Sequence, residues 1–385
     1  MGRTPFDIAD IVRCHRATLE TVQPLSSVQG RALSAITLCR TAALGGHRNV
    51  CLECGLEEDP SYNSCRNRNC PKCQALAQER WIASRAEALM PIPHFHGVFT
   101  LPEDFRPLAR RHPREIHDAL FRCTSETLLE MGESRLGVKL GLTLVLHTWT
   151  RDLRYHPHVH VLITAGGLVI DGKSFKHLRK KVLLHVKPLA ELFKGKMMDA
   201  LRDLQEQGVL GMTQGAFGAL MASLAGQDWN VYLKRPFSSP EFVLQYLGRY
   251  THRVGIANSR LLNVTEDEVT FRTKDGRSVT LQPVVFLQRF VQHVLPDRFK
   301  KIRHAGLYAS PKALASAKAC LKPMSTPSKP KRTWEEMLLE LTGRDVTRCS
   351  GCGAKLCRIE ILPERASFRV RRVKHSFSRQ ARSPP

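Results

Sequence analysis

The sequence predicts an α+β protein in which a mostly antiparallel sheet is flanked by helices and preceded by an amino-terminal zinc-binding region. Segments with the pattern of strands alternate loosely with helical segments, and hairpin-like turns join several of them. Two C-x-x-C pairs lie before the first of these strands. The 385 residues, 42% of them hydrophobic, suffice for two or three domains with buried cores.

The amino-terminal part is predicted to be helical on both sides of its cysteines. Apolar residues at helical spacing predict two helices within residues 1–45. Residues 74–90 contain good helix formers throughout, and Pro91 and Pro93 end that helix. These prolines mark an expected domain boundary at residue 93.

The central part carries the strands. Strands are predicted at residues 96–101, 140–149, 158–164 and 168–170, with a turn at Gly166-Gly167 and another at Asp171-Gly172. Helices are predicted at 107–131, 188–207, 214–224, 241–250 and 284–294, and a hairpin-type group of strands at 260–264, 269–272 and 277–281. This order favours a layered α+β domain at residues 94–305.

The carboxy-terminal part, residues 306–385, contains a linker and a basic tail. Residues 321–333 are rich in Pro, Ser and Lys, which is typical of a linker. Residues 365–382 hold seven cations and no acidic residue. Such a tail is a solvated arm, and at most a non-specific phosphate binder.

The charge balance indicates a polyanionic partner. Lys and Arg number 59 against 35 Asp and Glu, a formal net charge of +24, which argues against an acidic-surface metabolic enzyme. No run approaches 18 uninterrupted apolar residues, and the first twenty residues lack a signal-peptide core. We therefore expect a soluble, cytoplasmic protein with no membrane partner.

The first group of cysteines predicts a structural zinc site. Cys51-x2-Cys54 and Cys70-x2-Cys73 are fifteen residues apart, the spacing of two knuckles that close one four-thiolate Zn²⁺ site. Cys65 is a spare ligand in this interpretation. Arg66 and Arg68, between the knuckles, either contact DNA or belong to an exposed charged loop.

A second group, Cys349-x2-Cys352 with Cys357, offers three thiolates, and His375 is a candidate fourth ligand. The sequence leaves zinc binding there open. The remaining cysteines are interpreted as ordinary buried thiols: Cys14, Cys39, Cys123 and Cys320.

The segment Tyr155-His156-Pro157-His158-Val159-His160 predicts a catalytic metal site. In a strand, His158 and His160 project to the same face and Val159 to the other. Two neutral imidazoles suit a divalent ion that keeps open positions for water and phosphate oxygens. The alternative is a polar surface turn. His94-Phe95-His96 repeats the pattern, but Pro93 before it favours a turn that leads into a strand.

The segment 245–253 predicts a phosphate-binding helix face. Tyr246 and Tyr250 are four residues apart and therefore neighbours on a helix, with Arg249 and Arg253 on or near that face. Two phenols and two guanidinium groups suit a phosphate better than a core. A phenol attacks phosphorus when a metal or cations stabilise the phenolate. The alternative is ordinary amphipathic packing.

Together these segments resemble the two-tyrosine transposases of rolling-circle insertion sequences, a branch of the single-strand nucleases named for the His-hydrophobe-His (HUH) motif. The matching stretches are CLECG, SYNSCRNRNCPKCQ, HFHGVFTLP, HPHVHVLITAGG, QYLGRYTHRVGIANSRLL and FLQRFVQHVLPDRFKKIRH, in order across about residues 46–305. The resemblance implies a DNA-binding zinc region at residues 1–93, an HUH catalytic domain at 94–305 and a bacterial, nucleoid-associated protein.

The resemblance also implies the chemistry. His158 and His160 would hold Mg²⁺ or Mn²⁺ against the scissile phosphate of single-stranded DNA. Tyr246 and Tyr250 would attack in turn, each leaving a 5′-phosphotyrosine and a free 3′-hydroxyl. The third metal ligand stays open among Gln245, His252, His147 and His156.

Further DNA contacts are expected from basic stretches and aromatic residues. The basic residues are Lys173, Lys176, Arg179, Lys180, Lys181, Arg298, Lys300, Lys301 and Arg303. Trp81, Trp149 and Tyr155 are candidates for base stacking, although each fits a core position equally well.

Two other functions fit parts of the sequence. A replication initiator or conjugative relaxase would use the same chemistry. A zinc-dependent DNA-binding regulator would explain the charge and the cysteines, but would leave the histidine strand and the tyrosine pair without a role.

Overall fold

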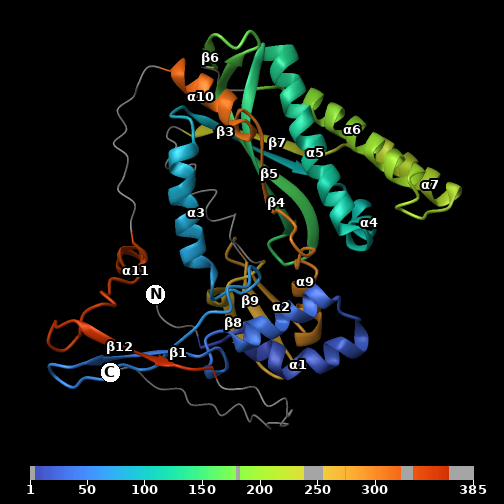
Figure 1. The fold of residues 1–385 in the computed structure, drawn as a ribbon. Helices are drawn as coiled ribbons and strands as arrows, with labels where there is room; N and C mark the ends of the chain where they lie inside the picture. The colour runs from blue at the N-terminus through green and yellow to red at the C-terminus, as the bar shows by residue number, and fades with distance from the viewer. Residues whose placement is uncertain (1–4, 179–182, 238–254, 274, 322–332, 364–385) are drawn as a thin grey trace. The chain divides into compact units, whose positions relative to one another are not determined.

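The computed structural model describes residues 5–178, 183–237, 255–273, 275–321 and 333–363 (Figure 1). The chain forms two compact units, each built from separate stretches. Unit 1 comprises Met1–Cys73, Ile256–Gln288 and Trp334–Pro385, and unit 2 comprises Gln74–Gly255 and Arg289–Thr333. These units are discontinuous along the chain, whereas the division expected above is linear. The linear division stays a prediction.

Unit 2 is built on an antiparallel sheet in the order β11-β4-β5-β3-β7, with β6 paired to β5. Its strands are β3 (His94–Thr100), β4 (Val138–Trp149), β5 (Tyr155–Val169), β6 (Phe175–His177), β7 (Val231–Phe237) and β11 (Ile302–Gly306). The long strands β4 and β5 are rich in Val, Leu, Ile and Thr, which favour a pleated, buried surface. The expected α+β class with an antiparallel sheet and flanking helices is confirmed.

The expected turn at Gly166-Gly167 is wrong, because β5 continues through both glycines to Val169. A Cβ atom on Gly167 would lie 2.4 Å from the carbonyl oxygen of Lys139, and one on Gly166 would lie 2.8 Å from that of Lys176. The glycines therefore permit close approach of neighbouring backbone within the sheet.

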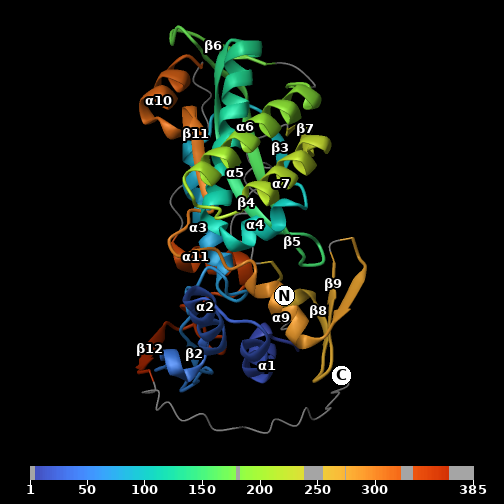
Figure 2. The same ribbon diagram turned by 90° about the vertical axis from the view of Figure 1, so that its right-hand side faces the viewer.

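One face of this sheet packs on helices. Figures 1 and 2 show α5 and α6 against it, with α7 beyond α6. The helices are α4 (Phe105–Arg111), α5 (Pro113–Met131), α6 (Val186–Glu206) and α7 (Gln214–Gly226). Phe95, Phe99, Val159 and Val161 point into this core and are at most 1% exposed. Burial of such side chains contributes roughly 1.5–3 kcal/mol each.

The opposite face of the sheet carries a smaller apolar cluster. Val145 and Leu162 pack there with Leu89, and with Trp81 and Ile82 of α3 (Gln74–Ala88). Helix α10 (Pro311–Ala319) adds a second small cluster through Ala317 and partly buried neighbours. Apolar packing therefore covers only part of this face.

Unit 1 combines helices with two small sheets. Its helices are α1 (Ile8–Val22), α2 (Ser27–Leu38) and α11 (Trp334–Thr342), and α9 (Pro283–Val291) belongs to it up to Gln288. One sheet has the order β12-β1-β2, from β1 (Gly46–Cys51), β2 (Ser61–Tyr62) and β12 (Leu356–Ile361). The other has the order β10-β9-β8, from β8 (Leu261–Val264), β9 (Val269–Arg272) and β10 (Ser278–Leu281).

Asp7 connects three segments of unit 1. Its carboxylate caps α1 by accepting a hydrogen bond from the backbone N–H of Ala9. The same carboxylate accepts from Lys72 at 2.6 Å and from the Asn258 amide at 3.0 Å. The first helix is thereby fixed to the cysteine-rich segment and to the segment that leads into β8.

Among the described residues, no helix has the length and apolar character that a membrane span requires.

Candidate functional site

Three histidines lie together on two neighbouring strands of unit 2. His147 of β4 is the register partner of His158 of β5, and His160 follows on the same face. One ring nitrogen of each lies within 4.8 Å of the others. The ring centroids of His147 and His160 are 4.4 Å apart, and those of His158 and His160 are 5.1 Å apart. Strand register alone thus creates a three-imidazole group suited to a divalent ion.

Of the four residues left open as a third ligand, His147 joins the pair. His156 is not part of the three-histidine group. Gln245 and His252 lie outside the described residues. The pairing of β4 with β5 brings His147 to the site, and the spacing within the HPHVH segment contains no information about it.

Hydrogen bonds orient two of these imidazoles. Nδ1 of His158 lies 2.8 Å from the backbone carbonyl oxygen of His156 and donates to it, so the ring is in the tautomer whose Nε2 carries a lone pair. Nδ1 of His160 lies 2.9 Å from Nε2 of His96, and both rings are buried. Burial lowers the pKa of His96 to about 4, so its ring is neutral at pH 7 and its Nε2 can accept a hydrogen bond from the Nδ1–H of His160.

The interpretation of His94-Phe95-His96 as a turn is wrong. Both histidines lie within β3, where His96 is the register partner of Leu162 on β5. Nε2 of His94 contacts the Tyr308 hydroxyl at 2.7 Å. The repeated His-apolar-His pattern was the available signal, because it places His96 on the same sheet face as His160.

An aromatic ring and a cation lie beside the histidine group. The indole of Trp149 stacks on His147 with centroids 4.7 Å apart. The ammonium of Lys301 lies 4.8 Å from the centre of the Trp149 ring. Tyr155, by contrast, is buried and its hydroxyl donates to the Ala109 carbonyl at 3.0 Å, so its ring is a core element. Trp81 is half-buried in the small cluster beside α3.

Eight of the twelve cysteines form two groups of four, and this corrects the expected site of Cys51, Cys54, Cys70 and Cys73. One group is Cys39, Cys65, Cys70 and Cys73, and the other is Cys51, Cys54, Cys349 and Cys352. The two expected knuckles therefore belong to different sites. Cys39 is a member of the first group, Cys65 is more than a spare ligand, and Cys357 belongs to neither group. His375 lies outside the described residues.

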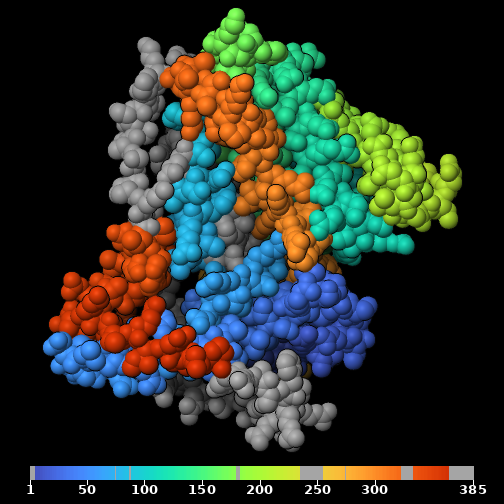
Figure 3. Space-filling model, viewed as in Figure 1, coloured from blue at the N-terminus to red at the C-terminus, as the bar shows by residue number. Residues whose placement is uncertain are grey.

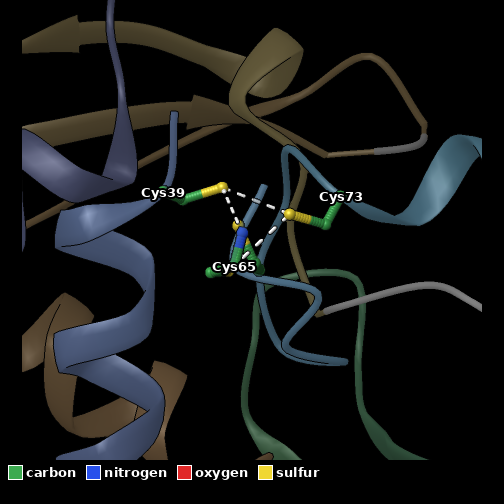
Figure 4. A group of neighbouring side chains, drawn as sticks. Cys39, Cys65 and Cys73 are labelled. Carbon is green, nitrogen blue, oxygen red and sulfur yellow. Dashed lines mark hydrogen bonds between the residues drawn. The ribbon is translucent and has the colours of Figure 1, made fainter. Parts of the chain in front are cut away.

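In the first group the thiols converge from the end of α2 and the loop that follows β2. Figure 4 shows Cys39, Cys65 and Cys73 pointing toward one another. The Cys39 and Cys73 sulfur atoms are 3.2 Å apart, and those of Cys65 and Cys73 are 3.6 Å apart. Hydrogen bonds with Cys39 and Cys70 lower the pKa of the Cys73 thiol. Four sulfur ligands in a closed arrangement fit structural Zn²⁺.

Comparison with known families identifies the chain. Residues 141–315 match the family described as "Putative transposase", and residues 11–101 match "Transposase zinc-binding domain". A "Putative transposase y4qJ" of Sinorhizobium fredii is 37% identical over 376 residues, which cover 91% of this chain and 94% of that protein. The chain belongs to the rolling-circle insertion-sequence transposases of the HUH type.

A second relative of this transposase is the "Transposase for insertion sequence element IS801" of Pseudomonas savastanoi pv. phaseolicola. It is 29% identical over 361 residues, which cover 86% of this chain and 83% of that protein. No solved structure matches the chain. The function is therefore DNA transposition by a DNA-binding, DNA-cleaving enzyme with a structural zinc-binding domain.

The predicted nucleophiles of the transposase, Tyr246 and Tyr250, lie outside the described residues, as do Arg249 and Arg253. Arg66 and Arg68 are exposed in the loop between Cys65 and Cys70. Arg66 adopts a left-handed backbone conformation with φ of 52°, which tightens this loop.

Three cations of the predicted basic stretches make contacts within unit 2 of the transposase. Arg303 forms an ion pair with Asp118 and lies 4.3 Å from the centre of the Phe121 ring. Lys176 donates to the Leu136 carbonyl at 2.9 Å. Lys301 lies beside Trp149, near the histidine group. Arg179, Lys180 and Lys181 lie outside the described residues.

Proposed function

We propose that this transposase nicks and rejoins single-stranded DNA through 5′-phosphotyrosine intermediates during rolling-circle transposition. Tyr246 and Tyr250 are the proposed nucleophiles. The observation that carries the proposal is the three-imidazole group of His147, His158 and His160 on one face of the sheet. A site of this kind suits an ion that must bind protein and phosphate at once.

In this proposal His147, His158 and His160 hold Mg²⁺ or Mn²⁺. When bound, the ion would polarise the scissile phosphate and stabilise the charge that develops on its oxygens. Three neutral nitrogen ligands leave coordination positions for those oxygens. His96 keeps His160 in the tautomer that presents Nε2, and the carbonyl oxygen of His156 does the same for His158.

The attachment of the tyrosine segment supports its role. Residue 237, which precedes the segment, is paired with His94 at the start of β3. Gly255, which follows it, lies so close to Leu153 and His293 that an added Cβ would be 3.0 and 3.1 Å from them. Both flanks of residues 238–254 are therefore held by the unit that carries the histidines.

The DNA strand is proposed to pass over Trp149 and Lys301, which combine a ring for base stacking with a cation for the backbone. Arg249 and Arg253 would neutralise the phosphate at the reacting tyrosines. Arg66 and Arg68 would contact DNA from the zinc-binding domain. Attack by a phenolate on the scissile phosphorus forms the tyrosine-phosphate bond and breaks the P–O3′ bond, and the leaving oxygen takes up a proton to become a 3′-hydroxyl. The 3′-hydroxyl of a second strand end can later attack the phosphotyrosine, which forms a new P–O3′ bond and releases the tyrosine.

The test is covalent capture. The full chain is incubated with Mn²⁺ and a labelled single-stranded oligonucleotide that carries an end of the element, and denaturing electrophoresis detects the adduct. Wild type forms the adduct, and mass spectrometry of the peptide identifies Tyr246 or Tyr250. The double variant Tyr246→Phe, Tyr250→Phe forms none, while the control Tyr62→Phe, in unit 1, behaves as wild type. Persistence of the adduct in the double variant contradicts the assignment.

A further inference from the structure

The second cysteine group consists of two turns with the same sequence pattern and the same geometry. Both read C-x-x-C-G, at residues 51–55 and 349–353. The Cys51 N–H donates to the Leu56 carbonyl at 2.9 Å, and the Cys349 N–H donates to the Ala354 carbonyl at 2.8 Å. The glycines that end the turns, Gly55 and Gly353, have φ of +72° and +75°. Two equivalent metal-binding knuckles thus come from opposite ends of the chain.

The sulfur atoms of these knuckles form a compact group. Sγ of Cys51 is 3.4 Å from Sγ of Cys352, and Sγ of Cys54 is 3.6 Å from Sγ of Cys349. All four lie within 4.8 Å of one another. A tetrahedral site with Zn–S bonds of about 2.3 Å has sulfur atoms about 3.8 Å apart, so the spacing fits Zn²⁺.

Backbone groups of the two knuckles form hydrogen bonds with these sulfur atoms, as is typical of metal-bound thiolates. The N–H of Gly351 donates to Sγ of Cys349 at 3.3 Å. The backbone of Cys54 also forms a hydrogen bond with the Cys51 thiol. Such donors stabilise the deprotonated sulfur that a metal requires.

The carboxy-terminal segment has little else to hold it. Among the described residues 334–363, Met337 and Cys349 are the two that are buried. Strand β12 pairs with β1 along Gly46–Cys51, but Ile359 on it is 52% exposed. The polar links are an ion pair of Arg344 with Glu58 and a contact of Arg358 with His47 at 3.1 Å. A strand pair with so few buried side chains is marginally stable in water.

We propose that Cys51, Cys54, Cys349 and Cys352 bind a second structural Zn²⁺, which closes a zinc ribbon assembled from both ends of the chain and fastens residues 334–363 to the amino-terminal part of unit 1. In Figure 3 the carboxy-terminal segment lies against the β1 region of this unit. The match to the transposase zinc-binding domain ends at residue 101, so it does not include Cys349 or Cys352. The proposal is independent of the tyrosine chemistry.

Cobalt substitution of the purified full chain counts the thiolate sites. Sulfur-to-cobalt charge-transfer absorption reports thiolate ligands, so metal in the histidine group does not contribute. Wild type saturates at two Co²⁺ per chain by this signal. Cys349→Ser with Cys352→Ser loses half of the signal, and Cys357→Ser, a matched control on the strand that follows the second knuckle, retains all of it. Saturation at one equivalent in wild type, or full signal in the double variant, overturns the proposal.

A cut chain tests the fastening without relying on a variant that folds poorly. A protease site is inserted after Ser328, and the cleaved zinc-loaded protein is run on a gel-filtration column. The fragment from residue 329 onward co-elutes with the rest of the chain, and a zinc chelator releases it. Cys349→His, which preserves a metal ligand, keeps it bound. Elemental analysis verifies that the chelator has removed the zinc. The proposal is overturned if the fragment separates from the zinc-loaded wild type, or if it stays bound once the zinc is gone.

Discussion

The histidine group and the cysteine groups differ in what holds their ligands in place. His147, His158 and His160 project from the two longest strands of a sheet whose other face is buried under α5 and α6. The cysteines of unit 1 lie mainly in turns and loops, and the strands beside them are short. The sheet therefore holds the three imidazoles in place by itself, whereas we expect the cysteine groups to depend on bound metal for their local structure.

This difference follows from the buried apolar surface in each region. Phe95, Val159 and Val161 alternate with the ligand face of the sheet and are almost completely buried. Around the second cysteine group, Leu52 is 78% exposed and Leu362 is 74% exposed. A metal whose apparent binding free energy is of the order of 10–16 kcal/mol compensates for this missing core.

Zinc removal should give the largest effect and should separate the two regions. Hydrogen exchange is measured on the full chain before and after treatment with a zinc chelator. Protection is expected to disappear in β1 and β12, because metal binding supplies free energy of the order of 10 kcal/mol there. Strands β3, β4 and β5 should keep their protection, since apolar packing holds them.

Readdition of Zn²⁺ is the control, and it should restore the lost protection. Equal loss of protection in β4 and β5 would show that the histidine sheet also depends on zinc, and would remove the distinction between the two regions.

Acid should destabilise the sheet region through buried neutral histidines. Burial lowers the pKa of His94 to about 4, of His117 to about 3 and of His293 to about 4. The unfolded chain binds protons at these sites below about pH 6.5 while the native state does not, so stability falls as the pH drops from 6.5 toward 4. Each histidine should lower the free energy of unfolding by about 1.4 kcal/mol for each pH unit in this range. Denaturant unfolding at several pH values measures this slope.

His117→Gln should reduce this slope by about one histidine's share, because it removes a titrating group beside the Tyr155 hydroxyl. His177→Gln, at an exposed position of β6, is the matched control variant. If the pH dependence of the unfolding free energy is the same in His117→Gln as in wild type, buried neutral His117 is not a source of the acid destabilisation.

Removing the two predicted metal ligands of the HPHVH segment should slow cleavage strongly and have little effect on folding. For His158→Ala with His160→Ala we expect the rate of oligonucleotide cleavage to fall about 10³-fold, because lost metal stabilisation amounts to several kcal/mol and each 1.36 kcal/mol is tenfold. The Tm should stay close to that of wild type. His177→Ala is the control for activity, and cleavage by the double variant within tenfold of wild type would exclude the histidine group as the catalytic metal site.

The strands of the main sheet are largely predictable from the sequence, because strand formation depends on residue types within each short segment. Runs rich in strand-forming residues predict most of β3 and β4 and part of β5, and the HPHVH spacing predicts two of the three grouped histidines. One long helix was expected at 107–131, but Pro113 disfavours a helical conformation at His112 and divides the stretch into α4 and α5.

Long-range partners were beyond local pattern. Knuckle spacing within residues 51–73 predicts a single site, because nothing local indicates that Cys51 and Cys54 face residues about 300 positions away. Cys39, at the end of α2, lacks the C-x-x-C pattern altogether. The repeated C-x-x-C-G sequence was the usable signal for the second group. His147 and His96 likewise depend on which strands become neighbours.

His96 offers the finest test of a preset histidine site, because it touches a proposed ligand without being one. Loss of its contact with Nδ1 of His160 should raise the Mn²⁺ concentration needed for half-maximal cleavage by about 10–100-fold in His96→Ala. The rate at saturating Mn²⁺ should change little, since the ligands themselves remain. His96→Gln places an amide near the lost Nε2 and should restore much of the affinity. His94→Ala removes a histidine on the same strand that contacts Tyr308 instead, so its metal requirement should match wild type. Equal effects of the two alanine variants would mean that β3 supports the site only through packing.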